Sequence, residues 1–540
     1  MDIGKSFEAV KAALEVDDLP TAVREATEAV NGGAQNGLFF NLAAYGLQLQ
    51  RRYDEALELL NRALRLTPED PLLWNAVGQL QLQQGKASDA VVSFQKALIH
   101  DSRLAPAHNG LGLAFEILGD LEFARLHQER AVRYAPNFAD PLGSLAVLAV
   151  MRKANDEGRA FAERALAIDP FQSAAILSLA TIELQEESLD SAEQRLRALI
   201  DHGSLTPLHE SSAQKLLGDV LDARGAALEA FGAYARGNAL SRGVYLPQLE
   251  AAGIESGVDL THRLARYFSA ASAKSWSSAP AVPEGEGTAR HVFMIGFYRS
   301  GTTLLEQVLA SHAEVVTLEE KPALDELAWD FFQNDEGLDS LSNLTRERAE
   351  ELRTEYWRKV RSYGVEPGEG VFVDKLPLGG LWAPFIAKVF PTARLLVVRR
   401  DPRDVVLSCF RHRFLPTSLP QEFTDIRRAA MLYDGVMALF EIYQAKLSLN
   451  VQICRHEDLV ADFDESVGEI CSFLQIPWRE EMRDFAEVAK NRDIRTPSAR
   501  QVVRGLYASG IGQWRAYAPA MPEALEILAP WVEKFGYEPA

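Results

Sequence analysis

The chain has 540 residues, 47% of them hydrophobic and 24% charged, which is the composition of a soluble protein with roughly two to four domains. Its formal charge of −20 at pH 7 argues against a general nucleic-acid or membrane-surface binder, although a local basic pocket remains compatible with it.

Three cysteines, Cys409, Cys454 and Cys471, match no metal-binding or disulfide spacing, which indicates buried thiols in a reducing compartment. The first residues lack an apolar signal segment, and no stretch reaches the ~18 consecutive apolar residues of a membrane span. We therefore expect a cytoplasmic protein without a membrane segment.

Small residues recur every 34 positions in the first half of the chain. One series consists of Ala29, Ala63, Ala97, Ala131 and Ala165. A second series with the same spacing consists of Ala22, Ala56, Ala90, Ala124 and Gly158. Such a period is typical of two short antiparallel helices per repeat, which cross at small residues and stack on the next repeat. The pattern predicts an α-helical solenoid over residues 1–270.

Three further residues make these repeats similar to the tetratricopeptide repeat (TPR) family. Trp74, Gly78 and Phe94 lie at the spacing of that family's Trp, Gly and Phe. Seven candidate units run from an atypical first near Phe7–Asn31 to a last near Leu217–Leu240. The resemblance implies a groove that docks a peptide or protein, and a spacer or a dimerisation scaffold is the alternative.

Beyond the repeats, the composition changes twice. Residues 271–290, ASAKSWSSAPAVPEGEGTAR, have no periodicity and indicate a linker or an exposed loop. Residues 291–540 alternate helical stretches with apolar runs, namely HVFMI (291–295), EVVTLE (314–319), VFVDK (371–375), RLLVVR (394–399) and VQICR (451–455). This alternation predicts a three-layer α/β domain with a parallel sheet, whose ligands bind at the carboxyl ends of the strands.

A glycine-bounded loop, GFYRSGTT (296–303), follows the first of these strands. It resembles a phosphate-binding loop, but Thr302 stands after Gly301 where a Walker A loop has lysine. The backbone N–H groups of residues 300–303 and the start of a helix favour an anion, and Arg299 supplies positive charge. The alternatives are a generic glycine-rich turn or a phosphate-loop kinase with Asp374 as its magnesium ligand.

A second strand-to-helix junction, RRDPRDVVLS (399–408), predicts another anion site. Asp401 is suited to cap the helix and Pro402 to begin it. Arg400 would then lie beside the first loop, and Ser408 would project from the helix. Two such sites suit a nucleotide with phosphates at two separate positions, whereas structural ion pairing is the alternative role for these arginines.

Together, FYRSGTTL, RRDPRDVVLS, RHEDLV and SARQVVRGLYASGIGQW resemble, in order and spacing, the sulfotransferase fold, and protein-tyrosine sulfotransferases in particular. The resemblance covers about residues 290–535. It implies that 3′-phosphoadenosine 5′-phosphosulfate (PAPS) is the co-substrate and that no metal is required. It also implies a cradle for the 5′-phosphosulfate that consists of Arg299, Ser300, Gly301, Thr302 and Thr303. Arg400 and Ser408 would hold the 3′-phosphate.

The same resemblance assigns the chemical roles. Glu320 matches the family's catalytic glutamate, and Glu319 is its alternative in a shifted alignment. Lys375 would neutralise the bridging oxygen, and Ser498 would support the same transition state. Arg504 matches a phosphate-contacting lysine, and His456 stands where the family has a tyrosine near the adenine. Two further departures, Gln513 for a lysine and His412 for an arginine, lie among the peripheral nucleotide contacts.

The sequence therefore predicts a PAPS-dependent sulfotransferase that moves a sulfuryl group to a hydroxyl acceptor. A protein or peptide tyrosine recruited by the TPR domain is the acceptor that we expect. The alternatives are a carbohydrate or small-molecule alcohol, or a TPR scaffold with a non-catalytic nucleotide-binding domain. The expected domains are residues 1–270, a linker over 271–290, and the sulfotransferase domain over 291–540; the sequence does not fix the oligomeric state.

Overall fold

The computed structural model describes residues 3–276, 290–414, 417–490, 506 and 510–539. Contacts within the chain divide it into two compact units, Met1–Leu205 and Thr206–Ala540. The predicted boundary at residue 270 rests on the repeat pattern and stays a prediction.

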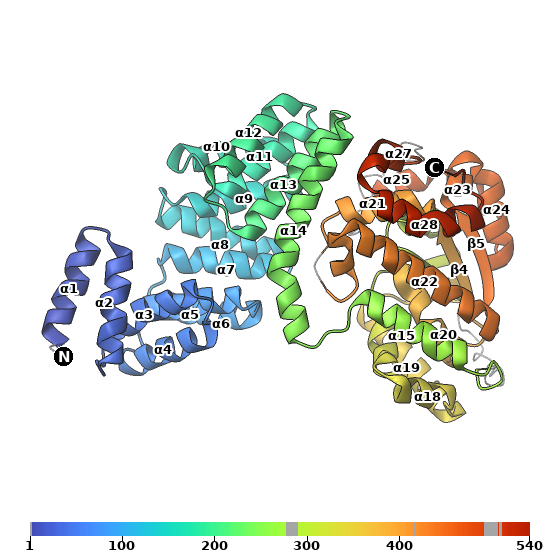
Figure 1. Ribbon diagram of the computed structural model, residues 1–540, viewed down its shortest axis with the longest axis horizontal. Coiled ribbons are helices and arrows are strands. Elements are labelled where there is room, and N and C mark those ends of the chain that lie inside the picture. Colours follow the sequence, from blue (N-terminus) through green and yellow to red (C-terminus); the bar gives the residue numbers. More distant parts are fainter. Residues whose placement is uncertain (1–2, 277–289, 415–416, 491–505, 507–509, 540) are drawn as a thin grey trace. The chain divides into compact units, whose positions relative to one another are not determined.

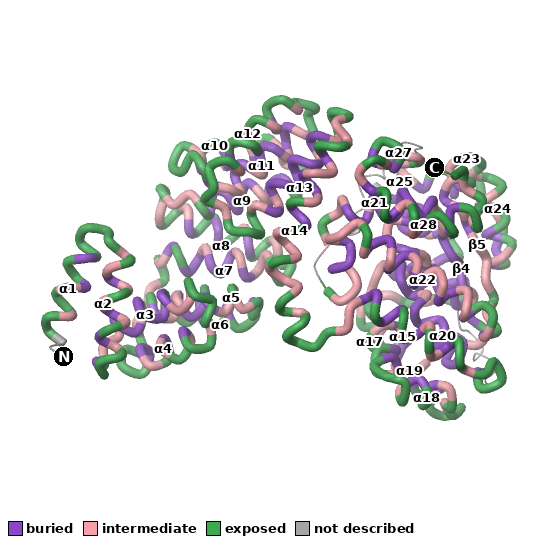
Figure 2. The backbone as a smooth tube through the Cα atoms, viewed as in Figure 1, coloured by how far each residue is buried: buried purple, intermediate pink, exposed green. Residues whose placement is uncertain are grey.

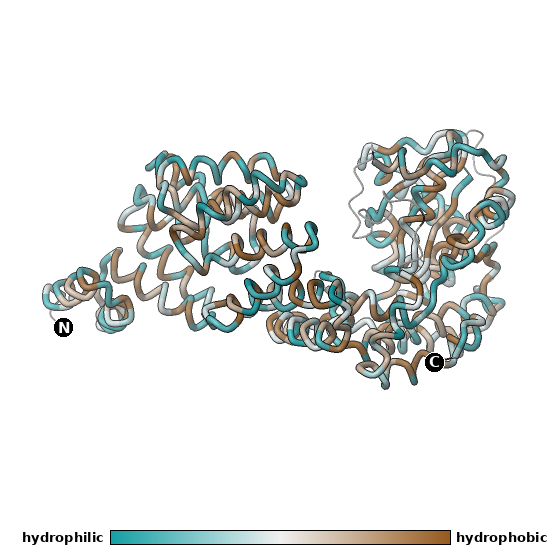
Figure 3. The backbone as a smooth tube through the Cα atoms, turned by 90° about the horizontal axis from the view of Figure 1, so that it is seen from above, coloured by the Kyte–Doolittle hydropathy of each residue, from teal (hydrophilic) through white to brown (hydrophobic). Residues whose placement is uncertain are grey.

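The first unit consists of helices in consecutive antiparallel pairs (Figure 1). Their bounds are α1 Ile3–Glu15, α2 Leu19–Asn31, α3 Gly37–Leu49, α4 Tyr53–Leu66, α5 Pro71–Gln83, α6 Ala87–His100, α7 Ala105–Ile117, α8 Leu121–Tyr134, α9 Ala139–Met151, α10 Asn155–Ile168, α11 Ser173–Gln185 and α12 Leu189–His202. Hydrophobic and hydrophilic stretches alternate along the backbone (Figure 3), and buried residues such as Ala22, Ala26 and Ala29 of α2 recur at helical spacing, which gives the helix an apolar side to bury. The predicted solenoid is confirmed.

Small residues allow the helices of each pair to approach closely. Ala63 and Ala97, which belong to the 34-residue series, are fully buried. Phe94 fills the space that Gly78 and Gly110 leave, since a Cβ on these glycines would lie 2.7 and 2.3 Å from the phenyl ring. Burial of such a ring stabilises the stack by about 2 kcal/mol. The repeat spacing is therefore a packing requirement.

The second unit contains a five-stranded parallel sheet in the order β2-β3-β1-β4-β5. The strands are β1 Arg290–Gly296, β2 Val315–Glu319, β3 Val371–Lys375, β4 Arg394–Arg399 and β5 Asn450–Arg455. Each coincides with one of the predicted apolar runs to within one residue. The α/β fold class with a parallel sheet is thus confirmed.

Helices precede the sheet, connect its strands and follow the last strand. Their bounds are α13 Pro207–Ala223, α14 Ala227–Ala251, α15 Gly257–Ala270, α16 Thr302–Ala310, α17 Asp325–Ala328, η1 Trp329–Phe332, α18 Asp335–Ser342, α19 Arg346–Ser362, η2 Pro377–Trp382, α20 Ala383–Val389, α21 Pro402–Arg411, η3 Pro420–Thr424, α22 Ile426–Lys446, α23 His456–Ala461, α24 Phe463–Leu474, η4 Glu480–Asp484, α25 Phe485–Lys490, α27 Trp514–Tyr517, η5 Ala518–Ala520 and α28 Pro522–Lys534. Among the described residues, no helix is both long and apolar enough to cross a membrane.

Both faces of the sheet are covered, as the nearly continuous burial of its three central strands, β3, β1 and β4, requires (Figure 2). On one face, Val292 and Met294 of β1 pack with residues of α16, α24 and α25. On the other face, His291 and Phe293 contact aromatic rings of α19 and the residue that follows α20. The loop at residues 297–301 and Glu320 directly follow the carboxyl ends of β1 and β2, the edge at which parallel sheets bind ligands.

The α13–α14 hairpin, which corresponds to the seventh predicted repeat, contacts the end of α21. Asn238 Nδ2 donates to the Phe410 carbonyl at 2.9 Å, and Phe231 stacks on the Phe410 ring with centroids 4.9 Å apart. Asp222 pairs with Arg411. Because the last carbonyls of a helix lack partners within it, this hairpin completes α21.

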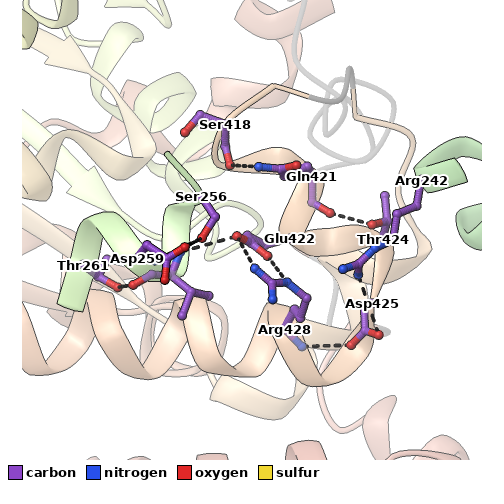
Figure 4. A network of polar contacts seen from close by, with 11 residues as sticks. Arg242, Ser256, Asp259, Thr261, Ser418, Gln421, Glu422, Thr424, Asp425 and Arg428 are labelled. Carbon is purple, nitrogen blue, oxygen red and sulfur yellow. Dashed lines mark hydrogen bonds and ion pairs between the residues drawn. The ribbon is translucent and has the colours of Figure 1, made fainter. Parts of the chain in front are cut away.

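A second polar network joins α14 and α15 to η3 and α22 (Figure 4). The carboxylate of Glu422, buried in η3, pairs with Arg428 of α22 and accepts a hydrogen bond from the Val258 N–H of α15 at 3.4 Å. Arg242 of α14 lies 3.9 Å from Asp425, the residue that caps α22. Helices α14 and α15 are therefore built into the second unit.

We predict that residues 206–540 unfold in one cooperative transition, whereas residues 271–540 do not. The shorter fragment lacks α13, α14 and α15, so it exposes Phe410 and leaves buried polar groups unpaired, at roughly 1–3 kcal/mol for each. Thermal unfolding followed by circular dichroism compares the two fragments. Equal melting temperatures and equal cooperativity would show that α13, α14 and α15 are dispensable.

Candidate active site

The loop between β1 and α16 has a backbone shape that demands glycine. Gly301 has φ 104° and caps α16, while Arg299, at φ 66°, is one of the few non-glycine residues in the left-handed region. A Cβ at Gly301 would lie 2.6 Å from His456 Nδ1. The predicted loop therefore closes tightly, with its N–H groups at the start of a helix.

The polar groups of this loop suit an anion. Ser300 is 1% exposed, and its Oγ has no hydrogen-bond partner among the described residues. Thr302 and Thr303 begin α16, where the orphan N–H groups and the positive end of the helix dipole favour negative charge. Unpaired hydroxyls are costly to bury, so a bound oxygen-rich group would satisfy Ser300. The residues present fit a phosphate-like ligand.

Helix α21 fastens this loop from the side. Arg400 donates through Nη1 to the Arg299 carbonyl at 3.1 Å, and Arg299 Nε donates to Ser408 Oγ at 3.0 Å. Cys409 Sγ donates to the Tyr298 carbonyl at 3.4 Å. The structure thus brings together the two predicted anion sites, and Arg299 directly joins them.

The beginning of α21 agrees with its sequence. Asp401 caps the helix by accepting from the Arg403 N–H at 2.9 Å, and Pro402 is its first residue, as predicted. Asp401 also pairs with the Arg403 side chain, whose guanidinium lies 3.9 Å from the Trp514 ring centroid. Arg403 thus has the structural role that the sequence left open, whereas Arg400 faces the loop.

His456 lies behind the loop against Gly301 and is 6% exposed. Burial and the nearby charge of Arg400 lower the pKa of His456 to about 3. A neutral imidazole at this position supports the loop without adding charge. Its predicted place near an adenine stays a prediction.

The predicted base and the predicted lysine lie side by side at the ends of β2 and β3. Glu320 directly follows β2, has φ 43°, and its N–H donates to the Lys375 carbonyl at 3.0 Å. Lys375 Nζ is 2.7 Å from Glu320 Oε1 and 3.9 Å from Glu319 Oε1. Glu320, which is 31% exposed, connects this pair to solvent.

Lys375 is completely buried, which distinguishes it from an ordinary strand end. Burial alone would lower the pKa of Lys375, but the carboxylates of Glu306, Glu320 and Glu319 outweigh burial and raise it. The ammonium therefore stays charged inside the protein. Glu306 was not anticipated from the sequence; its position within the buried face of α16 is the only signal there.

Asp374 belongs to a different environment. It is completely buried, and its Oδ2 accepts a hydrogen bond from Tyr356 Oη at 2.7 Å, while Tyr356 Oη lies 3.1 Å from His291 Nε2. Because side chains alternate along a strand, Asp374 faces the α19 layer and Lys375 the opposite one. This placement does not suit the solvent-facing magnesium ligand of the kinase alternative.

Two predicted residues, Ser498 and Arg504, lie outside the described residues, and so does most of SARQVVRGLYASGIGQW. The far end of that segment is held by Asp404, which accepts from the N–H groups of Gly512 at 2.6 Å and Trp514 at 3.0 Å. Asp404 was not anticipated from the sequence, although its place in the first turn of α21 is an available signal. Gln513, a departure from the family pattern, accepts from Arg411 at 3.1 Å.

Comparison with known families agrees with this geometry. Residues 291–480 match the model described as "Sulfotransferase family". The C-terminal region carries a sulfotransferase-family domain. Residues 50–85 and 78–137 match models described as "TPR repeat" and "Tetratricopeptide repeat". Residues 50–137 of the solenoid are thus similar to tetratricopeptide repeats.

Individual relatives are distant. An "Uncharacterized protein" of Aquifex aeolicus is 24% identical over 253 residues, which are 45% of this chain and 33% of that protein. "Protein-tyrosine sulfotransferase A" of Caenorhabditis elegans is 24% identical, over 47% of this chain and 68% of that protein. "Protein-tyrosine sulfotransferase" of Drosophila melanogaster is 21% identical, over 46% and 52%.

Among solved structures, a tetratricopeptide repeat protein from Parabacteroides merdae is 15% identical. The match covers 44% of this chain and 92% of that chain, with a TM-score of 0.35.

We predict that Asp374 makes stability fall as pH rises. Burial raises the pKa of Asp374 from 3.8 to about 7, although its bond with Tyr356 opposes this. The stabilising protonated form is present below the unfolded pKa and is lost as pH rises through the folded one. Between about pH 5 and 8 the wild type should lose about 2–3 kcal/mol relative to Asp374→Asn. Urea unfolding at both pH values measures this difference, and a pH-independent difference would contradict it.

Proposed function

We propose that the second unit transfers a sulfuryl group from PAPS to a hydroxyl acceptor. The proposal is carried by the Lys375 and Glu320 side chains, which lie 2.7 Å apart beside a phosphate-type loop at the carboxyl end of the sheet. PAPS would supply the activated sulfuryl group. The family match of residues 291–480 supports this reaction class.

The donor would be held by the two joined anion sites. Arg299, Ser300, Gly301, Thr302 and Thr303 would contact its 5′-phosphosulfate through backbone N–H groups and side chains. Arg400 and Ser408 would contact its 3′-phosphate. Arg504 would add a further phosphate contact, Ser498 would support the transferring group, and His456 would lie near the base.

Glu320 and Lys375 would have separate roles: Glu320 would accept a proton, and Lys375 would stabilise the negative charge on the leaving group. Glu320, whose carboxylate reaches solvent, would accept the proton of the acceptor hydroxyl as that oxygen bonds to sulfur. Lys375 would donate a hydrogen bond to the phosphate oxygen that keeps the electron pair of the broken S–O bond. No lysine of the Walker type and no metal are needed for these steps.

A phenol is the acceptor that we favour. Burial, together with the charges of Glu320 and Asp325, raises the pKa of the half-buried Tyr298, so this ring lies within electrostatic reach of the proposed base. Phe414 packs beside it, with ring centroids 5.3 Å apart. The neighbouring rings of Tyr298 and Phe414 could pack against the ring of a phenol. The names of the animal relatives, which are protein-tyrosine sulfotransferases, also favour a phenol. The TPR array would recruit the peptide that carries the tyrosine.

We predict selective binding of 3′-phosphoadenosine 5′-phosphate, measured by isothermal titration calorimetry against ATP with magnesium. Arg400→Ala should weaken binding roughly 10- to 100-fold, because a charged donor is lost. The control Arg346→Ala, on the exposed face of α19, should bind like the wild type. Preference for ATP, or binding of neither nucleotide, would reject the donor assignment.

We predict that Glu320→Gln abolishes sulfuryl transfer. Its Kd for 3′-phosphoadenosine 5′-phosphate should stay within about threefold of the wild-type value, because Glu320 acts as a base and does not hold the nucleotide. Transfer of labelled sulfate from PAPS to tyrosine peptides, glycans and small alcohols is the assay. Undiminished activity would exclude Glu320 as the base. Transfer to glycans or alcohols in preference to peptides would replace the phenol as acceptor.

A further inference from the structure

A second carboxylate lies beside Lys375 and is not used in the proposed chemistry. Glu306 Oε2 is 3.2 Å from Lys375 Nζ, and both residues are buried, at 1% and 0% exposure of their side chains. Glu306 belongs to α16, the helix that begins at the phosphate-type loop. It therefore reaches the lysine from a different element than Glu320 does.

The carboxylates around Lys375 differ in their access to solvent. The side chains of Glu320 and Glu319 are 31% and 22% exposed, whereas that of Glu306 is closed off. Asp374, which precedes Lys375 in β3, accepts a hydrogen bond from Tyr356 on the other side of the strand. An acceptor can approach Glu320 but not Glu306. Glu320 can therefore exchange a proton with the acceptor, whereas Glu306 cannot.

This difference matters during transfer. When Glu320 takes the acceptor's proton it becomes neutral, so Lys375 loses its nearest counter-ion at 2.7 Å. At that moment the ammonium must remain charged and directed at the leaving oxygen. A buried lysine without a counter-ion tends to lose its proton, because burial disfavours the charged form. A permanent second anion would prevent this loss.

We propose that Glu306 is a positioning residue that holds Lys375 in place while Glu320 is protonated. This inference rests on the proposed sulfuryl transfer and adds a residue to it. Glu306 touches neither donor nor acceptor and acts only through the lysine. The loop helix α16 would thereby set both the phosphate cradle and the position of the charge that stabilises the leaving group.

Two variants of Glu306 separate charge from shape. Glu306→Gln keeps the size of the side chain and removes its charge, whereas Glu306→Asp keeps the charge at a longer distance. The Gln variant should bind 3′-phosphoadenosine 5′-phosphate within about threefold of the wild type but have a kcat roughly 10- to 100-fold lower. The kcat of Glu306→Asp should lie between that of the wild type and that of Glu306→Gln. A matched control, Glu350→Gln on the exposed face of α19, should behave as the wild type.

The pH dependence distinguishes this role from mere structural support. Loss of the Glu306 charge should bring deprotonation of Lys375 to lower pH, so the ratio of variant to wild-type kcat should fall at least about threefold further between pH 7 and pH 9. The Nζ resonance of ¹⁵N-labelled Lys375, followed by NMR in the absence of donor, should titrate at lower pH in Glu306→Gln. This second measurement does not depend on activity.

Several results would overturn the inference. A Glu306→Gln chain with wild-type kcat and an unchanged Lys375 titration would do so, and so would an equal effect of Glu306→Gln in a Lys375→Ala background. If the wild type itself transfers no sulfuryl group, the proposed function fails and this inference fails with it. Wild-type transfer combined with an unaffected Gln variant rejects the role of Glu306 alone.

Discussion

A fully buried ammonium ion, that of Lys375, is the constraint on which the candidate site depends. A charge inside a protein is stable only when opposite charges and hydrogen bonds replace the water that it has lost. Here the replacements come from α16 through Glu306 and from the end of β2 through Glu319 and Glu320. The order β2-β3-β1 makes this possible, since it sets β3 between the strand that carries the acids and the strand that feeds α16.

Helix α21 is the second element that organises the site. Arg400, just before α21, and Ser408 within it contact the loop, while the end of α21 is completed by Asn238 of α14 and by the ion pair of Arg411 with Asp222 of α13. Because α21 is held near both ends, its residues have little freedom to move relative to the loop. The geometry of the anion cradle is thereby tied to a hairpin that, in the sequence, reads as the last repeat.

Local elements could be predicted from the sequence more fully than the residues that form the candidate site. The repeat spacing, the five strands and the cap at Asp401 follow from local patterns, and the structure agrees with them. The roles of Glu320 and Lys375 came from family resemblance alone, since an isolated strand end such as VFVDK looks solvated. The sequence marked Glu306 and Asp404 only by their positions in helices, because their partners, Lys375 and the N–H groups of Gly512 and Trp514, are about 70 and 110 positions away.

The sequence by itself determined the periodic features: an array of helical hairpins that cross at Ala63 and Ala97, followed by a parallel sheet with a phosphate-type loop. These features depend on residues close together in the chain, whose spacing matches the geometry of a helix or strand. Only the tertiary structure decided which charges meet. Packing removed Lys375 from water, turned Asp374 to the opposite side, and brought α13 and α14 onto α21, because burial and long-range contacts are properties of the folded chain.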